Sequence, residues 1–382
     1  MNAVDILMRK AESMANVLET RALVAERNGK LPEETVRELS AEGLFSLVKP
    51  AAHGGKELNA AAVLKVCAAL GKGCASTGWV GCVFNVHHWV AALYPEQAQG
   101  EYFGQDDVLS SASFAPSGTA IATEGGYRAT GRWSFASGVD YADWCFLTSL
   151  VSEPHDGDPT GPYFLMVPAA DYHIDHDSWQ VSGLRATGSK DVVLDETFVP
   201  MHRACFLPSL LSGNSPGSKI HRGSLFHVPG HPFLVAVLAT PVLGAVQRGV
   251  ELFRDRIVER RFSLTGQRQA EQPAAKVALA EADACVTAAQ ALLENTFSTI
   301  ERLVPEAPLV QQARIPRDTA FAMQLLVRAI DIVFENVGGA ALQESNPIQR
   351  IWRDVHAAKA HAAVNWNTQA LAWGELSLDD AN

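Results

Sequence analysis

The sequence predicts an α+β fold in which a β-rich domain stands between two helical regions. From Val4 to about Phe103, apolar residues recur at the spacing of one helix face, and the same pattern returns from about Pro232 to Gly374. Between Val108 and Arg203 the pattern changes to short runs rich in β-branched and aromatic residues, separated by glycine, proline and aspartate. The order helical, β, helical therefore organises the whole chain.

The length of the chain supports more than one packed part. At 382 residues, of which 47% are hydrophobic, it exceeds the usual length of one compact domain and can bury a large core. We expect an N-terminal helical domain, a central β domain, a Gly/Ser/Pro-rich connecting loop and a C-terminal helical bundle, with the boundaries 1–106, 107–205, 206–231 and 232–382.

The segment LPEETVRELSAEGLFSLV illustrates the N-terminal helices. Pro32 stands in the first turn and acidic residues follow it directly, as at a helix start. Val36, Leu39, Leu44 and Leu47 are spaced for one buried face. The strands are expected in runs such as GYRATGRWSF, DWCFLTSLV, YFLMVP and KDVVLDETFVP.

Charge and apolar patterning exclude several classes of protein. A net charge of −11 with scattered lysine and arginine disfavours binding to nucleic acid or anionic lipid. The N-terminus lacks the pattern of a signal peptide, and the longest apolar run, HPFLVAVLATPVLGAV, contains prolines and is too short to span a bilayer. We expect a soluble cytoplasmic protein.

Motifs for metal, phosphate or nicotinamide binding are not found. The six cysteines form no CxxC, the histidines form no HExxH, and we expect no metal site. GLRATGSK resembles a phosphate loop, but Ser189 separates its second glycine from Lys190 and a strand follows. GKGCASTG lacks the GxGxxG spacing and lies between helices.

A polar stripe is predicted on NPIQRIWRDVHAAKAHAAVNWNTQALAWG, taken as one helix. Asp354, His361, Asn365 and Thr368 are spaced for one side of that helix, and small alanines flank His361. A core histidine bonded to a neighbour is the alternative interpretation. The helix STGWVGCVFNVHHWVAALYP also carries histidine in an apolar run, and the turn GRWSFASGVDYADW is rich in serine and tryptophan. These three segments favour a shared pocket.

Several segments, in order, carry a resemblance to the acyl-CoA dehydrogenase superfamily. They are LPEETVRELSAEGLFSLVKPAAHGG, ASTGW, GRWSFASGVDYADW, GLRATGSKDVVLDETFVP and NPIQRIWRDVHAAKAHAAVNW. Within the superfamily the chain most resembles the oxygenase components of two-component flavin-dependent monooxygenases that hydroxylate aromatic compounds. The resemblance implies an N-terminal helical domain, a central β-barrel-like domain and a C-terminal four-helix bundle, assembled as a homotetramer.

The resemblance also implies a flavin site. Phe135 would pack on the isoalloxazine ring, and Ser137 would form a hydrogen bond near its N5 and O4 atoms. Ser113 and Phe114 would supply a second edge. An ordinary aromatic-rich β-hairpin is the alternative interpretation of this turn.

The resemblance also suggests residues that would bind the flavin phosphates, and these lie far from that turn in the sequence. Arg261, from a neighbouring subunit, is the closest match to the phosphate-binding arginine of relatives. Gly338 and Gly339 resemble the backbone segment that approaches the same phosphates. The choice between FAD and FMN stays open.

The resemblance leaves two kinds of flavin enzyme to distinguish, a dehydrogenase and a monooxygenase. Many acyl-CoA dehydrogenases carry a glutamate base about nine residues after the start of an Arg-Asp pair; counted from Arg353 and Asp354, that position holds Ala362. An acyl-CoA dehydrogenase or flavin oxidase with a displaced base remains an alternative, as does a non-catalytic flavin-binding relative.

The monooxygenase interpretation assigns acid-base roles. By resemblance, reduced flavin (FADH2 or FMNH2) and O2 would form a C4a-hydroperoxide where water is excluded, and Ser137 would hold the N5 proton. His361 is the expected base for a phenolic or indolic substrate, oriented by Asp354 or Asn365, with His87 facing it across the pocket.

Two further expectations complete that interpretation. His356 would replace His361 if the helix register differs, and Tyr141, where relatives often carry a polar residue, suggests a less polar pocket. No nicotinamide site is encoded, so reduced flavin must come from elsewhere; the resemblance implies that a separate NAD(P)H:flavin reductase supplies it.

Overall fold

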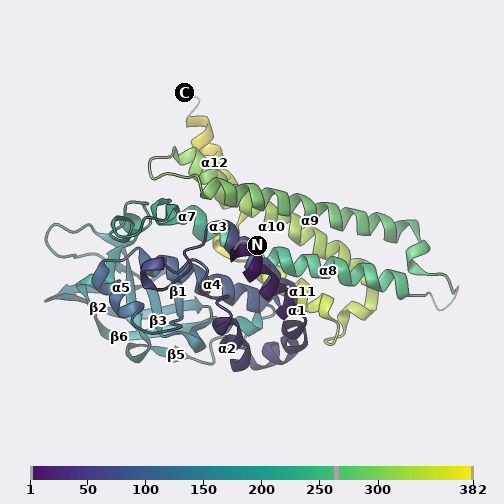
Figure 1. Cartoon of the computed structure of the whole chain (residues 1–382), viewed down its shortest axis with the longest axis horizontal. Helices are drawn as coiled ribbons and strands as arrows, with labels where there is room; N and C mark the ends of the chain where they lie inside the picture. The colour runs from purple at the N-terminus through teal and green to yellow at the C-terminus, as the bar shows by residue number, and fades with distance from the viewer. Residues whose placement is uncertain (1–2, 262–265, 380–382) are drawn as a thin grey trace.

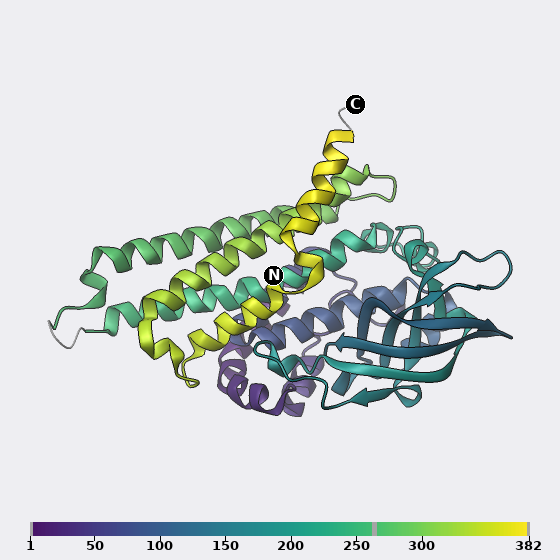
Figure 2. The same ribbon diagram turned by 180° about the vertical axis from the view of Figure 1, so that it is seen from behind.

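The computed structural model describes residues 3–261 and 266–379, and it has the predicted order of helices, strands and helices (Figure 1). N-terminal helices lie over the sheet, which occupies one end of the molecule, and long C-terminal helices extend away from it (Figures 1 and 2). The expected α+β fold is confirmed.

The N-terminal helices lie between the sheet and the C-terminal helices, and the fourth of them packs against the first strand of the chain. They are α1 (Ala3–Asn28), α2 (Glu33–Ala41), α3 (Ala60–Gly73), α4 (Ala75–Ala92) and α5 (Glu96–Tyr102). Pro32 precedes α2 and acidic residues fill its first turn, as the sequence predicts. Nearly every side chain of α4 is buried, which explains why its sequence is apolar all round.

The central domain is a curled seven-stranded mixed sheet with the strand order β5-β6-β2-β1-β3-β4-β7. β1 pairs with β3 in parallel, and the other pairs are antiparallel. The strands are β1 (Ser110–Thr123), β2 (Gly126–Ala136), β3 (Trp144–Val151), β4 (Gly161–Pro168), β5 (His173–Asp175), β6 (Lys190–Pro200) and β7 (Ala204–Phe206).

Strand β3 is buried on both faces. Cys145 and Leu147 lie in a core enclosed by the sheet, while Trp144 and Phe146 lie in the larger core shared with the helices. Successive side chains of a strand point to opposite faces, so this one strand contributes to both cores. Its near-continuous apolar sequence, WCFLTSLV, follows from that position.

The C-terminal region contains the expected four-helix bundle. Helices α8 (Thr240–Glu259), α9 (Pro273–Ile300), α10 (Leu309–Val337) and α11 (Pro347–Lys359) pack together, and α12 (Trp366–Asp379) packs on α10. Two short helices, α6 (Leu207–Leu210) and α7 (Gly230–Ala236), precede the bundle. Residues 230–259 form a helical segment that is long and apolar enough to cross a membrane. However, 78% of its apolar 18-residue stretch is buried inside the protein, as in a core helix.

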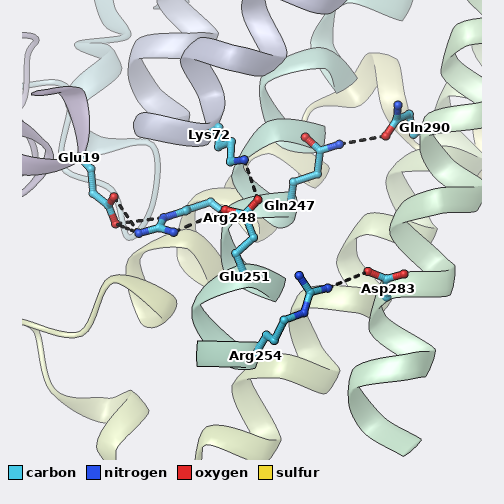
Figure 3. Close-up of polar contacts among 8 residues, drawn as sticks. All are labelled: Glu19, Lys72, Gln247, Arg248, Glu251, Arg254, Asp283 and Gln290. Atoms are coloured by element: carbon cyan, nitrogen blue, oxygen red, sulfur yellow. Dashed lines mark hydrogen bonds and ion pairs between the residues drawn. The ribbon is translucent and has the colours of Figure 1, made fainter. Parts of the chain in front are cut away.

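Close packing joins α8 to the N-terminal helices. A Cβ on Gly244 would lie 1.8 Å from the carbonyl oxygen of Ala68, so only glycine permits this crossing. Figure 3 shows the polar contacts beside it: Arg248 binds Glu19 of α1 at 3.0 Å, and Lys72 of α3 binds Glu251 at 2.6 Å. Partly exposed ion pairs of this kind each contribute about 0–1 kcal/mol, so apolar packing dominates the junction.

The single helix predicted around His361 is wrong. Helix α11 ends at Lys359, a 3-10 turn spans Ala362–Val364, and α12 begins at Trp366. The Asn365 side chain accepts hydrogen bonds from the backbone N–H and the hydroxyl of Thr368, which is how an N-cap starts a new helix. Asp354, His361 and Asn365 therefore do not form one stripe.

Candidate flavin and substrate site

Three segments distant in the sequence meet around Trp79 of α4. The indole N–H of Trp79 donates to Ser137 Oγ at 3.2 Å, and its ring lies 6.0 Å, between centroids, from that of His361. Ser137 lies in the turn after β2, and His361 lies in the α11–α12 connection. The structure thus brings together the turn and the histidine that the sequence analysis selected.

Buried hydroxyl groups surround Ser137. Its Oγ lies 2.7 Å from Ser189 Oγ, which lies 2.6 Å from Thr187 Oγ1. Ser111 of β1 donates to the Ser137 backbone carbonyl at 2.9 Å. These bonds fix the turn against β1 and against the loop that precedes β6, so the Ser137 hydroxyl has a defined position.

Phe135 presents a largely exposed aromatic ring beside this turn, with an edge contact to Trp179. Its side chain is 68% exposed, and its backbone adopts a left-handed φ of 67°. A bulky residue with positive φ stores strain of about 1–3 kcal/mol, and such strain clusters at functional sites. An exposed ring next to a buried hydroxyl suits a flat ligand with one polar edge, as the predicted isoalloxazine contact requires.

Ser113 and Phe114 occupy β1 beside a break in its pairing with β3. The Ser113 hydroxyl donates to the Ser134 carbonyl at 2.9 Å, and the Phe114 ring lies 4.8 Å from Phe164. Ser113 therefore uses its proton within the sheet and keeps only acceptor capacity for a ligand. Phe114 remains partly exposed.

His87 of α4 is buried beside β1. Its Nδ1–H donates to the Ser110 carbonyl at 2.7 Å, which leaves Nε2 as the acceptor nitrogen. Burial lowers the pKa of His87 to about 4, partly offset by that hydrogen bond. The imidazole is therefore neutral at physiological pH.

The His361 side chain is exposed, although neighbouring protein groups displace part of the water around its imidazole. Loss of hydration there lowers the pKa of its imidazole. Its Nδ1 accepts a hydrogen bond from the Ala363 N–H at 3.2 Å, so the proton of the neutral ring is on Nε2. His361 thus presents a donor nitrogen away from its own backbone.

The groups expected to orient His361 have other partners. Asp354 accepts a hydrogen bond from the Leu184 N–H at 2.6 Å, and Asn365 caps α12. Among the described residues neither group is hydrogen-bonded to an imidazole, so neither is observed to orient His361. Its observed orienting group is the backbone of Ala363.

His356 is engaged elsewhere in the bundle. Its Nε2 lies 2.8 Å from Asp331 Oδ1, an oxygen that also accepts from the Trp352 indole at 2.7 Å. The His356 ring contacts that of Trp352 at 4.4 Å. This pairing between α10 and α11 indicates a packing role and weakens His356 as the substitute base.

Asp354 links the bundle to the loop before β6 and supplies a stability prediction. Burial raises the pKa of Asp354 from 3.8 to about 6. A carboxyl with a raised folded pKa binds extra protons in the native state, so stability falls as pH rises from about 4 to above 6. The shift corresponds to roughly 3 kcal/mol.

Asp354→Asn keeps an acceptor for Leu184 and removes this titration. The free energy of unfolding of the wild type, minus that of the variant, should fall by roughly 3 kcal/mol across that pH range in urea titrations. Asp283→Asn, at an exposed ion pair with Arg254, is the control. A pH-independent difference for Asp354→Asn would contradict the burial argument.

Arg261, Gly338 and Gly339 lie at the far end of the bundle. Neighbouring Arg260 donates to the Val337 carbonyl at 2.9 Å, so the α8–α9 connection and the end of α10 are adjacent. Helix α11 has 13 residues at about 1.5 Å each, so its two ends, one of them near His361, lie roughly 20 Å apart. The predicted phosphate residues are near one another, but they are remote from His361 of the same chain.

Tyr141 contacts the N-terminal helices. Its hydroxyl donates to the Leu31 carbonyl between α1 and α2, and its ring is half-buried there. The side chain thus ties the turn to the N-terminal helices.

Sequence reasoning missed Trp79, Thr187 and Ser189. The last two lie in GLRATGSK, the segment rejected as a phosphate loop, and Trp79 ends the ASTGW motif. Their signal was present: hydroxyl residues two apart directly before a strand, and an indole in a helix that is otherwise apolar. Nothing in the spacing showed that both approach Ser137.

The helical layer, the curled sheet, the four-helix bundle and this aromatic and hydroxyl-lined site define a protein of the acyl-CoA dehydrogenase class. Residues 6–103 match the family described as "Acyl-CoA dehydrogenase, N-terminal domain", and residues 236–366 match "Acyl-CoA dehydrogenase, C-terminal domain". The chain belongs, within that superfamily, to the oxygenase components of flavin-dependent monooxygenases.

Relatives and solved structures support this membership along nearly the whole chain. The oxygenase component of FADH(2)-dependent resorcinol hydroxylase from Rhizobium sp. (strain MTP-10005) is 33% identical, covering 97% of this chain and 94% of the relative. The HsaA oxygenase subunit of Rhodococcus jostii (strain RHA1) is 32% identical, covering 93% and 94%.

The solved structures agree in fold. XiaF from Streptomyces sp., in complex with FADH2 and glycerol, superimposes with a TM-score of 0.91 at 29% identity, covering 98% of this chain and 96% of that one. The HsaA monooxygenase from M. tuberculosis gives 0.91 at 30% identity, covering 99% and 98%.

Proposed function

We propose that the chain hydroxylates a phenolic or indolic small molecule, using O2 and reduced flavin that a separate NAD(P)H:flavin reductase supplies in the cytoplasm. The observation that carries this proposal is the meeting of Ser137, Trp79 and His361 beside the exposed ring of Phe135. Relatives at 33% and 32% identity are named as flavin-dependent oxygenases, one of them a resorcinol hydroxylase.

The residues present fit a flavin ring. Phe135 offers an exposed apolar face, and Ser137 offers a hydroxyl oxygen at the buried end of the same turn. Phe114 and Ser113 offer a second apolar and polar pair. Reduced flavin supplies the electrons that activate O2; the protein holds the ring, excludes water and positions the proton donors and acceptors. We propose FADH2, as in the name of the resorcinol hydroxylase.

His361 is the proposed proton-handling group for the substrate. Its low pKa keeps it neutral at physiological pH, and its Nε2–H is available to a substrate oxygen. To act as the base through Nε2, His361 must adopt its other neutral tautomer, with the proton on Nδ1. That tautomer gives up the hydrogen bond that Nδ1 accepts from the Ala363 N–H. His87, with its free Nε2 acceptor, is the proposed second contact for the substrate hydroxyl.

The remote position of Arg261 supports an assembly of several copies. Because Arg261, Gly338 and Gly339 lie near the end of α11 that is roughly 20 Å from His361 of their own chain, they suit the phosphates of a flavin held by a neighbouring copy. We propose the homotetramer usual for such oxygenases. The dehydrogenase alternative gains no support, because the base position holds Ala362.

Product formation with supplied reduced flavin tests the proposal. Purified protein, photochemically reduced FAD and air-saturated buffer should convert at least one phenol of a panel to a product one oxygen atom heavier, measured by mass spectrometry. Resorcinol, p-hydroxyphenylacetate and indole-3-acetate form the starting panel, since relatives are named for them. Flavin reduction by an acyl-CoA, without any reductase, would contradict the proposal.

Dependence on a reductase gives a separate prediction. The isolated chain should not oxidise NADH or NADPH with free flavin, because its sequence contains no nicotinamide-binding motif. Addition of an unrelated NAD(P)H:flavin reductase should start hydroxylation, followed by absorbance at 340 nm and product analysis. Steady turnover with NADPH in a preparation free of reductase would disprove the two-component arrangement.

A further inference from the structure

A chain of four hydrogen bonds passes through Ser137, and both of its ends have fixed polarity. It begins at the Trp79 indole N–H, which can only donate, and ends at the Leu184 carbonyl, which can only accept. Between them lie the hydroxyls of Ser137, Ser189 and Thr187, with successive separations of 3.2, 2.7, 2.6 and 2.8 Å. We refer to these five residues as the hydroxyl relay.

The two ends determine where every hydroxyl proton lies. Thr187 donates its proton to the Leu184 carbonyl, so the proton between Thr187 and Ser189 must come from Ser189. Each serine has one hydroxyl proton, so the proton between Ser189 and Ser137 must come from Ser137. The relay therefore runs in one direction, from Trp79 to Leu184.

Backbone hydrogen bonds hold the Leu184 end of the relay in place. The Leu184 backbone has a φ of 51°, and its N–H donates to buried Asp354 of α11. The Thr187 carbonyl accepts from the Gly138 N–H at 2.8 Å, which ties the loop back to the turn that carries Ser137. Ser137, Thr187 and Ser189 are all buried, so water does not compete freely for their hydroxyls.

Ser137 consequently has only one free hydrogen-bonding site. Its proton is directed to Ser189 and one lone pair receives the Trp79 N–H, which leaves a single lone pair for a ligand. Toward any ligand in the site Ser137 is an acceptor. It lacks a proton to donate unless the relay is broken.

We propose that the hydroxyl relay makes the site selective for the redox state of flavin, with Ser189 and Thr187 as positioning residues. This inference rests on the proposed function. Reduced flavin carries a proton at N5 and can donate it to Ser137, whereas oxidised flavin presents a lone pair at N5. Two facing acceptors repel, so the relay favours the reduced form and helps release the oxidised form after turnover.

Two substitutions break the relay and leave Ser137 in place. Ser189→Ala removes the group that receives the Ser137 proton. Thr187→Val is nearly isosteric and removes the acceptor for Ser189, which is then free to reverse its hydroxyl. In both variants Ser137 can turn its proton toward the ligand and accept oxidised flavin. Thr187→Ser keeps the hydroxyl and is the matched control.

The test compares dissociation constants for the two redox states. Oxidised FAD is titrated in air and photoreduced FAD under anaerobic conditions, with ultrafiltration to measure the free flavin. The wild type should bind reduced FAD more tightly. Ser189→Ala and Thr187→Val should lower this preference by about tenfold, mainly because oxidised FAD binds more tightly, while Thr187→Ser keeps it.

A gain in affinity for oxidised flavin is not expected from structural damage, which would weaken both forms together. If Thr187→Val and Ser189→Ala keep the wild-type preference for reduced FAD, or lose affinity equally for both forms of FAD, the relay proposal is overturned. The proposed function still stands in that case if the wild type hydroxylates. If Ser189→Ala does not fold, Thr187→Val decides alone. A wild type that binds neither form of flavin would contradict the proposed function itself.

Discussion

Replacing His361 by asparagine is expected to slow hydroxylation of the aromatic substrate by roughly 100-fold, because the variant keeps a similar size but loses the titrating imidazole. In the wild type the rate should fall as pH drops through the His361 pKa, which burial places below the ordinary value of 6.5. The variant should lack that acidic limb. Single-turnover mixing of the reduced-flavin complex with O2 and substrate measures both effects.

His356→Asn is the control for this prediction. His356 is paired with Asp331 and its ring contacts that of Trp352, so its loss should lower stability while the pH profile of hydroxylation keeps its shape. If His356→Asn abolished hydroxylation and His361→Asn did not, the assignment would be reversed. Normal hydroxylation by both variants would show that neither histidine acts in the reaction.

Replacing Ser137 by alanine is expected to uncouple oxygen consumption from hydroxylation. The variant loses the one free acceptor lone pair beside the exposed Phe135 ring, leaves the Trp79 N–H without its acceptor and removes the hydroxyl that donates to Ser189. Most of the reducing equivalents should be recovered as hydrogen peroxide rather than as hydroxylated product. The measurement is the ratio of product to reduced flavin consumed, together with a peroxidase-coupled assay.

Ser149→Ala provides a matched comparison. Ser149 is a fully buried serine of β3 whose hydroxyl oxygen has no hydrogen-bond partner among the described residues, so its removal changes volume and polarity without touching the turn. Its ratio of product to reduced flavin should equal that of the wild type. A wild-type ratio in Ser137→Ala would show that this hydroxyl does not protect the reaction.

The fold could be predicted because its signals are local and repeated. Helical spacing of apolar residues, the proline and acids at the start of α2, and the alternation in β2 each recur within a few residues. The prediction of one continuous helix through His361 was wrong for an equally local reason. Apolar and polar spacing continued through residues 360–365, while one side-chain cap, Asn365, started a new helix.

Only part of the candidate site could be predicted from the sequence. Phe135, Ser137 and His361 stand in motifs that resemble those of relatives, so the sequence could select them. The orienting contacts could not be selected: Ala363 acts through its backbone N–H, and Ser189 reaches Ser137 through the pairing of β2 with β6. Such contacts depend on tertiary structure and leave no spacing pattern in the chain.

Strand β3 makes the sheet and the helical layer a single cooperative unit. Trp144 and Phe146 belong to the core under the helices, while Cys145 and Leu147 belong to the core inside the sheet. Detaching the helices would expose the first pair to water, and opening the sheet would expose the second pair. The turn that carries Ser137 lies between β2 and β3 in the chain, so its shape depends on both cores, and loosening either core is expected to disturb it.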